Sequence, residues 1–299
     1  MTTLDVRVFV QTRGIARATD YAFLGAAPPE PWWRAYRDVT AFDHPTVLVV
    51  SDGACWAAYL SGIPSFRVDA VGTVVRYTLV LDGPCGAADA GCVPAAVGAW
   101  LDDVAAGHGD RPGGPLATAL DARFPADDVE RWLTSDVRAG RAAASPADKQ
   151  ASARVRRRAL AALTTLPAPP TATDEPGEWI GAVGAPGPRA AFTARVAALV
   201  DGLPGRALLL NLVGGVADAG ALADPASPAA VLVESGEPQL ARCTALRPVV
   251  EAKKAPPAAR PPRRTGTAAV AGIAVLPAVA VMGMLAMTVL VVTLLVWLL

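Results

Sequence analysis

The chain has 299 residues, with 27 Lys or Arg and 27 Asp or Glu, so its formal net charge is zero. This balance excludes binding to nucleic acid by bulk electrostatics, and the length allows one large domain or two small ones. The abundance of Ala, Gly, Pro and Arg is typical of a high-GC bacterial genome, and the four scattered cysteines do not suit a disulfide framework.

The first part of the chain is predicted to form β-strands. In residues 4–11, Val6, Val8 and Val10 alternate with polar or aromatic residues, which is the period-two pattern of a half-buried strand. Asp5, Arg7 and Arg13 interrupt the apolar residues at the start of the chain, so we expect no N-terminal export signal. Further strands are expected at 46–51, 65–69 and 71–81.

Helical patterns follow these strands. Helices are expected at 93–106, 127–133 and 148–163. The stretch 166–178 is rich in Pro and polar residues and cannot continue a helix. We therefore predict an N-terminal α/β lobe over 1–165 and a linker at 166–178.

A second α/β lobe is predicted over 179–250. Its elements are expected to be a strand at 179–183, a helix at 189–200 and strands at 207–213 and 231–234. The sequence thus predicts an α/β head, with a mixed sheet and helices in one or two lobes.

A transmembrane helix is predicted at 266–299. This segment has about 34 residues without a charged side chain, where roughly 20 suffice to cross a bilayer. Pro277 is expected to kink it, which places the core of the span at 278–298. A buried core helix and a hairpin of two short spans are the alternatives.

The orientation of this segment follows from its basic flank. A Pro-rich tether at 251–265 precedes it and contains Lys253, Lys254, Arg260, Arg263 and Arg264. Because positive residues flank a span on its cytoplasmic side, we expect a tail-anchored, single-pass protein of the cell membrane with a cytoplasmic head. These charges also suit contact with anionic lipid.

Three arginines in the first lobe are candidates for binding an anion. Arg13 follows the first strand, and Arg67 and Arg76 interrupt otherwise apolar strands. If Asp69 has to serve Arg67, a positive remainder is left for a phosphate or carboxylate ligand. The alternative is a solvated sheet face.

A glycine-rich loop in the second lobe is another anion candidate. Gly184 and Gly187 lie between an expected strand and an expected helix, with Arg189 nearby. Backbone N–H groups at a helix N-terminus bind phosphate. The spacing matches neither the Walker pattern nor the dinucleotide fingerprint, so a plain tight loop is the alternative.

Nucleophilic and metal chemistry have weaker support. Ser51 ends a predicted strand but lacks the G-x-S-x-G pattern of a nucleophile elbow. Cys85, Cys92 and His108 lack the spacing of a zinc site. We therefore predict no catalytic residue, no metal and no cofactor.

The sequence leaves three hypotheses about function. The first is a binding, sensing or scaffold module that places protein partners at the membrane. The second is a membrane-acting effector of a bacterial signalling or defence system, whose tail helices form a homo-oligomer through small residues such as Ala268 and Gly272. The third is an enzyme of unrecognised type. Lipid is an expected partner in the first two hypotheses, and nucleic acid is not.

Overall fold

The head is a mixed α/β structure. The computed structural model describes residues 6–16, 20–138, 146–169, 177–213, 227–234 and 241–242. Within them the strands are β1 (Arg7–Thr12), β2 (Ala22–Phe23), β3 (Thr46–Ser51), β4 (Cys55–Val68), β5 (Val74–Pro84), β6 (Trp179–Ala182), β7 (Gly205–Leu210), β8 (Ala229–Val233) and β9 (Ala241–Arg242). The helices are α1 (Cys92–Ala105), α2 (Pro115–Arg123), α3 (Ala126–Arg138), α4 (Pro146–Leu163), α5 (Pro186–Asp201) and the short 3-10 helices η1 (Trp32–Tyr36) and η2 (Ala88–Gly91). The predicted α/β class is confirmed.

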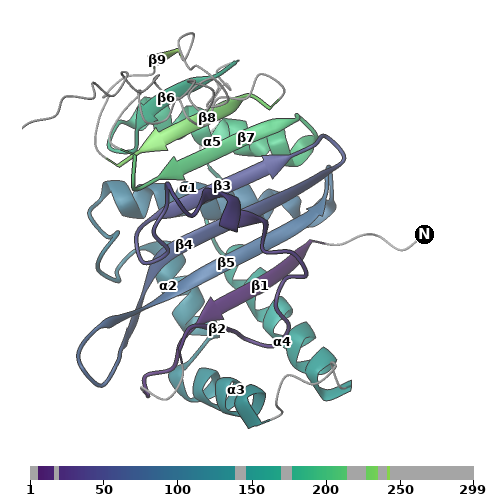
Figure 1. Ribbon diagram of the computed structural model, residues 1–299, viewed down its shortest axis with the longest axis vertical. Coiled ribbons are helices and arrows are strands. Elements are labelled where there is room, and N and C mark those ends of the chain that lie inside the picture. Colours follow the sequence, from purple (N-terminus) through teal and green to yellow (C-terminus); the bar gives the residue numbers. More distant parts are fainter. Residues whose placement is uncertain are drawn as a thin grey trace, which may run out of the picture. The chain divides into compact units, whose positions relative to one another are not determined.

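All of these strands belong to one sheet, in the order β2-β1-β5-β4-β3-β7-β8-β6-β9 (Figure 1). Neighbours from β2 to β7 are antiparallel, β7, β8 and β6 run parallel, and β9 is antiparallel to β6. Because β3 pairs with β7, both predicted lobes contribute to a single sheet. The Pro-rich segment 166–178 therefore does not separate two sheets.

Most predicted elements are present, and the two largest differences concern β4 and α2. Strand β4 begins at Cys55, well before the predicted start at 65. Residues 58–65 are buried on both faces, so they lack the alternating pattern by which a strand is predicted. Helix α2 was not predicted, since it is short and lies next to a Gly- and Pro-rich stretch. Pro115 starts it at a position where proline is well tolerated.

One face of the sheet packs against helices α1, α2, α4 and α5, which lie behind the strands in Figure 1. The predicted alternation in β1 is confirmed, since Val8 and Val10 point into this core. Trp100 of α1 and Phe192 of α5 are fully buried in it. Each such side chain contributes on the order of 1.5 to 3 kcal/mol.

The opposite face carries the segment between β2 and β3, which includes η1. Trp33 stacks on Tyr59 of β4, with ring centroids 5.3 Å apart and an interplanar angle of 17°. Trp32 and Tyr36 pack against the same apolar cluster. This aromatic segment covers the middle of the face and borders a groove at one end of the strands, described below.

The predicted membrane segment is not part of the described structure. Among the residues that the structure describes, no helix is long and apolar enough to cross a bilayer. The predicted tether at 251–265 and the predicted span at 266–299 lie outside those residues. The single-pass anchor therefore stays a prediction.

Candidate functional site

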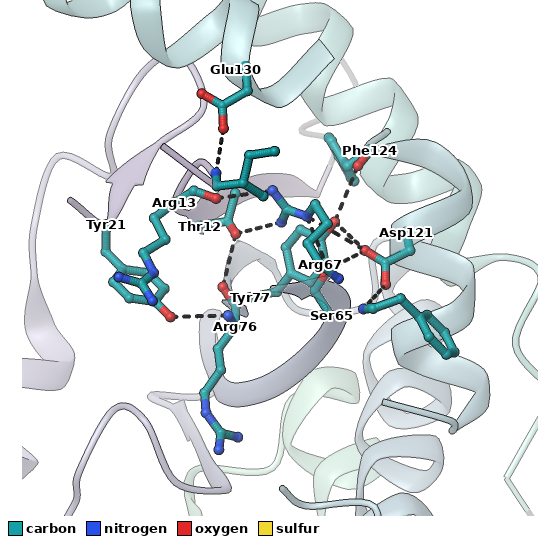
Figure 2. A network of polar contacts seen from close by, with 12 residues as sticks. Thr12, Arg13, Tyr21, Ser65, Arg67, Arg76, Tyr77, Asp121, Phe124 and Glu130 are labelled. Carbon is teal, nitrogen blue, oxygen red and sulfur yellow. Dashed lines mark hydrogen bonds and ion pairs between the residues drawn. The ribbon is translucent and has the colours of Figure 1, made fainter. Parts of the chain in front are cut away.

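Arg67 is the centre of a polar network beside the β4–β5 hairpin (Figure 2). Its side chain is 8% exposed. The guanidinium donates to Ser65 Oγ at 3.0 Å, to Thr12 Oγ1 at 2.8 Å and to the Arg13 carbonyl oxygen at 3.0 Å. It also lies over the Tyr77 ring, 4.9 Å from the centroid. These contacts fix the guanidinium within the fold.

Asp121 of α2 supplies the negative charge of this network. One of its carboxylate oxygens lies 3.9 Å from Arg67 Nε and accepts hydrogen bonds from Ser65 Oγ at 2.6 Å and Tyr77 Oη at 2.9 Å. The other oxygen accepts from the Phe66 N–H at 2.7 Å. Burial raises the pKa of Tyr77 well above its ordinary value, so the phenol stays protonated and remains a donor.

Arg13 is paired with Asp69. The distance from Arg13 Nη2 to Asp69 Oδ2 is 2.6 Å, and the guanidinium lies 5.4 Å from the centroid of the Tyr21 ring. Asp69 Oδ1 accepts hydrogen bonds from the N–H groups of Thr73 and Val71. These contacts hold the pKa of Asp69 below its usual range, and the hydrogen bond from the Thr73 N–H contributes most to this shift. Asp69 is therefore committed to Arg13 and to its own turn.

Arg76 of β5 points away from Arg67 (Figure 2). Its Nη1 donates to the carbonyl oxygens of Gly62 at 2.8 Å and Gly109 at 2.9 Å, and its Nη2 lies 3.2 Å from Asp110 Oδ1. Arg76 thus joins strand β4 to the loop that precedes α2.

The three predicted anion-binding arginines therefore differ from the expected arrangement. Asp69 pairs with Arg13 rather than with Arg67, and each arginine has an aspartate partner of its own. The expectation of an unbalanced positive charge is wrong, because α2 and the loop before it supply two carboxylates that local sequence does not reveal. Anion binding by Arg13, Arg67 or Arg76 stays a prediction, and the contacts favour a structural role.

The glycine-rich loop connects β6 to α5, as predicted. A Cβ atom added at Gly184 or Gly187 would meet no heavy atom within 4 Å, so close approach does not require glycine there. Arg189 donates to the Val183 carbonyl oxygen at 2.8 Å and to Asp102 Oδ1 at 3.3 Å. It joins the loop to α1, and phosphate binding by this loop stays a prediction.

Ser51 lies far from His44, the histidine nearest to it in sequence. Its Oγ accepts a hydrogen bond from the Gly53 N–H at 3.1 Å and lies 3.6 Å from Cys85 Sγ. His44 precedes the start of β3 whereas Ser51 ends it, which separates the two by roughly 20 Å at about 3.3 Å per residue. His44 therefore does not serve Ser51 as a general base.

The described cysteines and histidines do not gather either. Among the described residues, no group of three or more His, Cys, Asp or Glu side chains is placed to hold a metal ion. Cys55, Cys85 and Cys92 are free thiols. Burial raises the pKa of Cys92 to about 11, so it is an unreactive core residue.

A groove of about 560 Å³ lies on the outer face of the sheet. Small molecules typically occupy sites of roughly 300 to 1,000 Å³. Its floor is formed by β1, β3, β4 and β5, and its wall by residues 28–30 and the first residue of η1. The lining residues are Arg7, Pro28, Pro29, Glu30, Trp32, Val50, Ser51, Asp52, Cys55, Trp56, Ala57, Val80 and Asp82.

The groove carries more negative than positive charge. Of the residues that line it, Glu30, Asp52 and Asp82 are acidic, and Arg7 is basic. Arg7 Nε is hydrogen-bonded to Asp82. The Cys55 N–H, and then the Ala54 N–H, hydrogen-bond to the Asp52 carboxylate and hold its pKa below the usual range.

Comparisons with known proteins add no family to this description. They found no matching family model, no matching curated protein and no matching solved structure. Sequence reasoning also missed the groove. The available signal was the small size of Cys55 and Ala57, which share the outer face of β4 with Tyr59 and leave space on it.

Asp103 of α1 is a buried carboxyl group outside the groove. It is 3% exposed, and its Oδ2 has no hydrogen-bond partner within the described structure. A hydrogen bond to the Leu116 backbone places the carboxyl at the N-terminus of α2. Burial raises its pKa to about 6, although the charge of His108 acts in the opposite sense.

This raised pKa makes stability depend on pH. Because the folded protein holds the proton of Asp103 more tightly than the unfolded chain, its stabilising effect is complete below about pH 4 and is lost as the pH rises through 6. We expect Asp103→Asn to match the wild type near pH 4 and to exceed it by on the order of 2 kcal/mol at pH 7.5. Urea unfolding at several pH values measures this.

A matched control is Asp38→Asn, which changes a side chain that is 89% exposed. It should leave the dependence of stability on pH between 4 and 7.5 unchanged. An equal pH dependence in wild type and Asp103→Asn would show that Asp103 is not the titrating group.

Proposed function

We propose that this protein is a membrane-anchored binding module whose cytoplasmic head takes a small organic cation into the groove beside η1. The observation that carries the proposal is the composition of the groove. It combines a cavity of ligand size, an excess of carboxylates and a wall that contains the indole of Trp32.

Charge and shape support a cation as the ligand. Arg7 offsets Asp82, whereas Glu30 and Asp52 have no basic partner among the described lining residues. Trp32 contributes an indole ring to the wall. An ammonium or guanidinium group beside an indole face and a carboxylate gains from both.

The floor supports a ligand rather than a closed core. Cys55 is exposed, and Ala57 is only partly buried although it lies on a central strand. Neither side chain is large enough to fill the space above β4. A ligand that covers this part of the sheet would bury both.

The membrane part of the proposal rests on the sequence. The uncharged segment 266–299 is long enough to cross a bilayer, and its basic flank at 251–265 favours a cytoplasmic head. Such an arrangement would hold the ligand-binding head, and any protein partner that it recruits, at the inner face of the cell membrane.

Because Cys55 lines the groove, one alkylation experiment tests both the orientation of the head in the membrane and the cation site. In inverted membrane vesicles, which expose the cytoplasmic face, an impermeant maleimide is expected to alkylate Cys55 of the full-length protein. Choline or putrescine at ten times its Kd should slow this reaction roughly tenfold, whereas citrate should not. Mass spectrometry of the Cys55 peptide measures the rate.

Two variants and a second preparation provide the controls. Glu30→Gln should weaken binding roughly tenfold, the effect of losing about 1.4 kcal/mol, so that the same cation concentration slows alkylation only about twofold. Asp127→Asn, on the exposed side of α3, should leave the protection unchanged. If the impermeant maleimide alkylated Cys55 when added outside sealed cells, the cytoplasmic assignment of the head would be wrong. Alkylation that no cation slows would contradict the ligand site alone.

A further inference from the structure

The tip of the β4–β5 hairpin extends beyond the neighbouring strands. Strand β3 pairs with β4 only as far as Ser61, and β1 pairs with β5 only from Thr78. The residues between these positions pair with each other, and the hairpin projects from the sheet (Figure 1). Large apolar side chains are exposed on it, with Phe66 at 57%, Val68 at 51% and Val71 at 57%.

The charged residues of this hairpin are turned inward. Among the described residues 63–75, Arg67 and Asp69 are the charged side chains, and they are 8% and 5% exposed. Arg67 is held by the network around Asp121, and Asp69 pairs with Arg13. The surface that the tip presents is therefore uncharged, although the sequence of the hairpin contains both signs.

The tip also has a fixed shape. The Asp69 N–H donates to the Thr73 carbonyl oxygen at 2.9 Å, and the Gly72 N–H donates to the Asp69 carbonyl oxygen at 3.0 Å. Gly72 has a φ of 83°, which glycine adopts without strain. Val71 is thus held at the apex of an ordered turn, so little further ordering is needed when the turn meets a surface.

We infer that this hairpin tip inserts into the interfacial region of the lipid bilayer. The inference rests on the proposed membrane anchorage, which keeps a bilayer within reach of the head. A tether at 251–265 spans at most roughly 46 Å if it is fully extended at about 3.1 Å per residue. A surface that binds a protein partner generally has a polar rim, which forms hydrogen bonds with that partner. Here the exposed tip consists of Phe66, Val68, Ala70, Val71, Gly72 and Thr73.

An environment-sensitive fluorophore at residue 71 tests the inference. The full-length protein carries Val71→Cys, has its four native cysteines replaced by Ala, and is reconstituted into vesicles of phosphatidylcholine and phosphatidylglycerol. We expect a blue shift of the emission, and loss of intensity when the lipids carry a nitroxide quencher. Both effects should be absent when the protein is kept in solution by an amphipathic polymer that replaces detergent and no lipid is present.

Native Cys55 supplies the matched control. It lies at the other end of β4, about 40 Å from Val68 at about 3.3 Å per residue. A fluorophore on Cys55, with the other cysteines replaced, should show neither the shift nor quenching by lipid. Phe66→Asp should abolish the shift at residue 71, whereas Leu203→Asp, in the exposed turn before β7, should preserve it.

The outcomes separate the two proposals. If the protein floats with the vesicles but the residue 71 fluorophore reports water, the hairpin inference is wrong and the anchor stands. If the protein does not float with the vesicles, the anchor itself fails and the hairpin inference fails with it. A shift that lipid nitroxide does not quench and that grows with protein density would place a second copy on the tip and overturn the inference.

Discussion

Arg67→Met is expected to lower the free energy of unfolding by about 3 kcal/mol, because breaking a buried ion pair leaves the remaining charge without its partner. The substitution keeps much of the side-chain volume and removes the guanidinium. Thr12 Oγ1 and the Arg13 carbonyl oxygen would lose their donors, and Asp121 would lose its cation. Urea unfolding of the full-length protein in mild detergent, followed by tryptophan fluorescence, measures the change.

Arg7→Met is the matched control for this experiment. Arg7 also pairs with an aspartate, but its side chain is 56% exposed. Exposed ion pairs contribute about 0 to 1 kcal/mol, so this variant should unfold almost as the wild type does. Equal losses in the two variants would contradict the structural role of the Arg67 network.

A comparison of the wild type with Arg67→Met also tests the predicted anion site. A structural role for Arg67 implies that inorganic phosphate does not raise the melting temperature of the wild type. Stabilisation by phosphate that disappears in Arg67→Met would show that the guanidinium binds a ligand, despite its internal partners.

Local sequence patterns predicted much of the sheet. The alternation of Val8 and Val10 placed β1, and the apolar run at 46–51 matches β3. The part of β4 before residue 65 was missed because residues 58–65 show no alternation and Gly62 and Pro64 interrupt the apolar run. Alternation thus detects strands with one exposed face, and an unbroken apolar run detects a strand such as β3 that is buried on both faces.

The candidate sites were predictable only in part. Buried arginines at positions 67 and 76 were expected to need partners, and they have them. The partners come from α2 and from the loop before it, which are distant in sequence and were not predicted to lie near the hairpin. The groove likewise combines β1, β4 and β5 with the segment 28–32, so no short motif could reveal it.

Gly62→Ala is expected to destabilise the head by about 3 to 5 kcal/mol, through a backbone conformation and a close contact that act together. Gly62 has a φ of 79° and lies where the register of β4 and β5 shifts. A Cβ atom there would lie 2.3 Å from the His44 carbonyl oxygen and 2.7 Å from Pro45 N, which are backbone atoms that cannot rotate away. Either the start of β3 or residue 62 itself would have to move. A shift of residue 62 would disturb the hydrogen bond from Arg76 to its carbonyl oxygen.

Gly72→Ala separates the two contributions. Gly72 has a nearly equal φ of 83°, but a Cβ atom there would meet no heavy atom within 4 Å. This variant should therefore lose only the conformational part, about 1 kcal/mol. Urea unfolding of both variants in the same detergent measures the difference, which is assigned to the contact with residues 44 and 45. If Gly62→Ala unfolds no more easily than Gly72→Ala, β3 yields at low cost, and the tight packing between the bulge of β4 and the start of β3 does not stabilise the sheet.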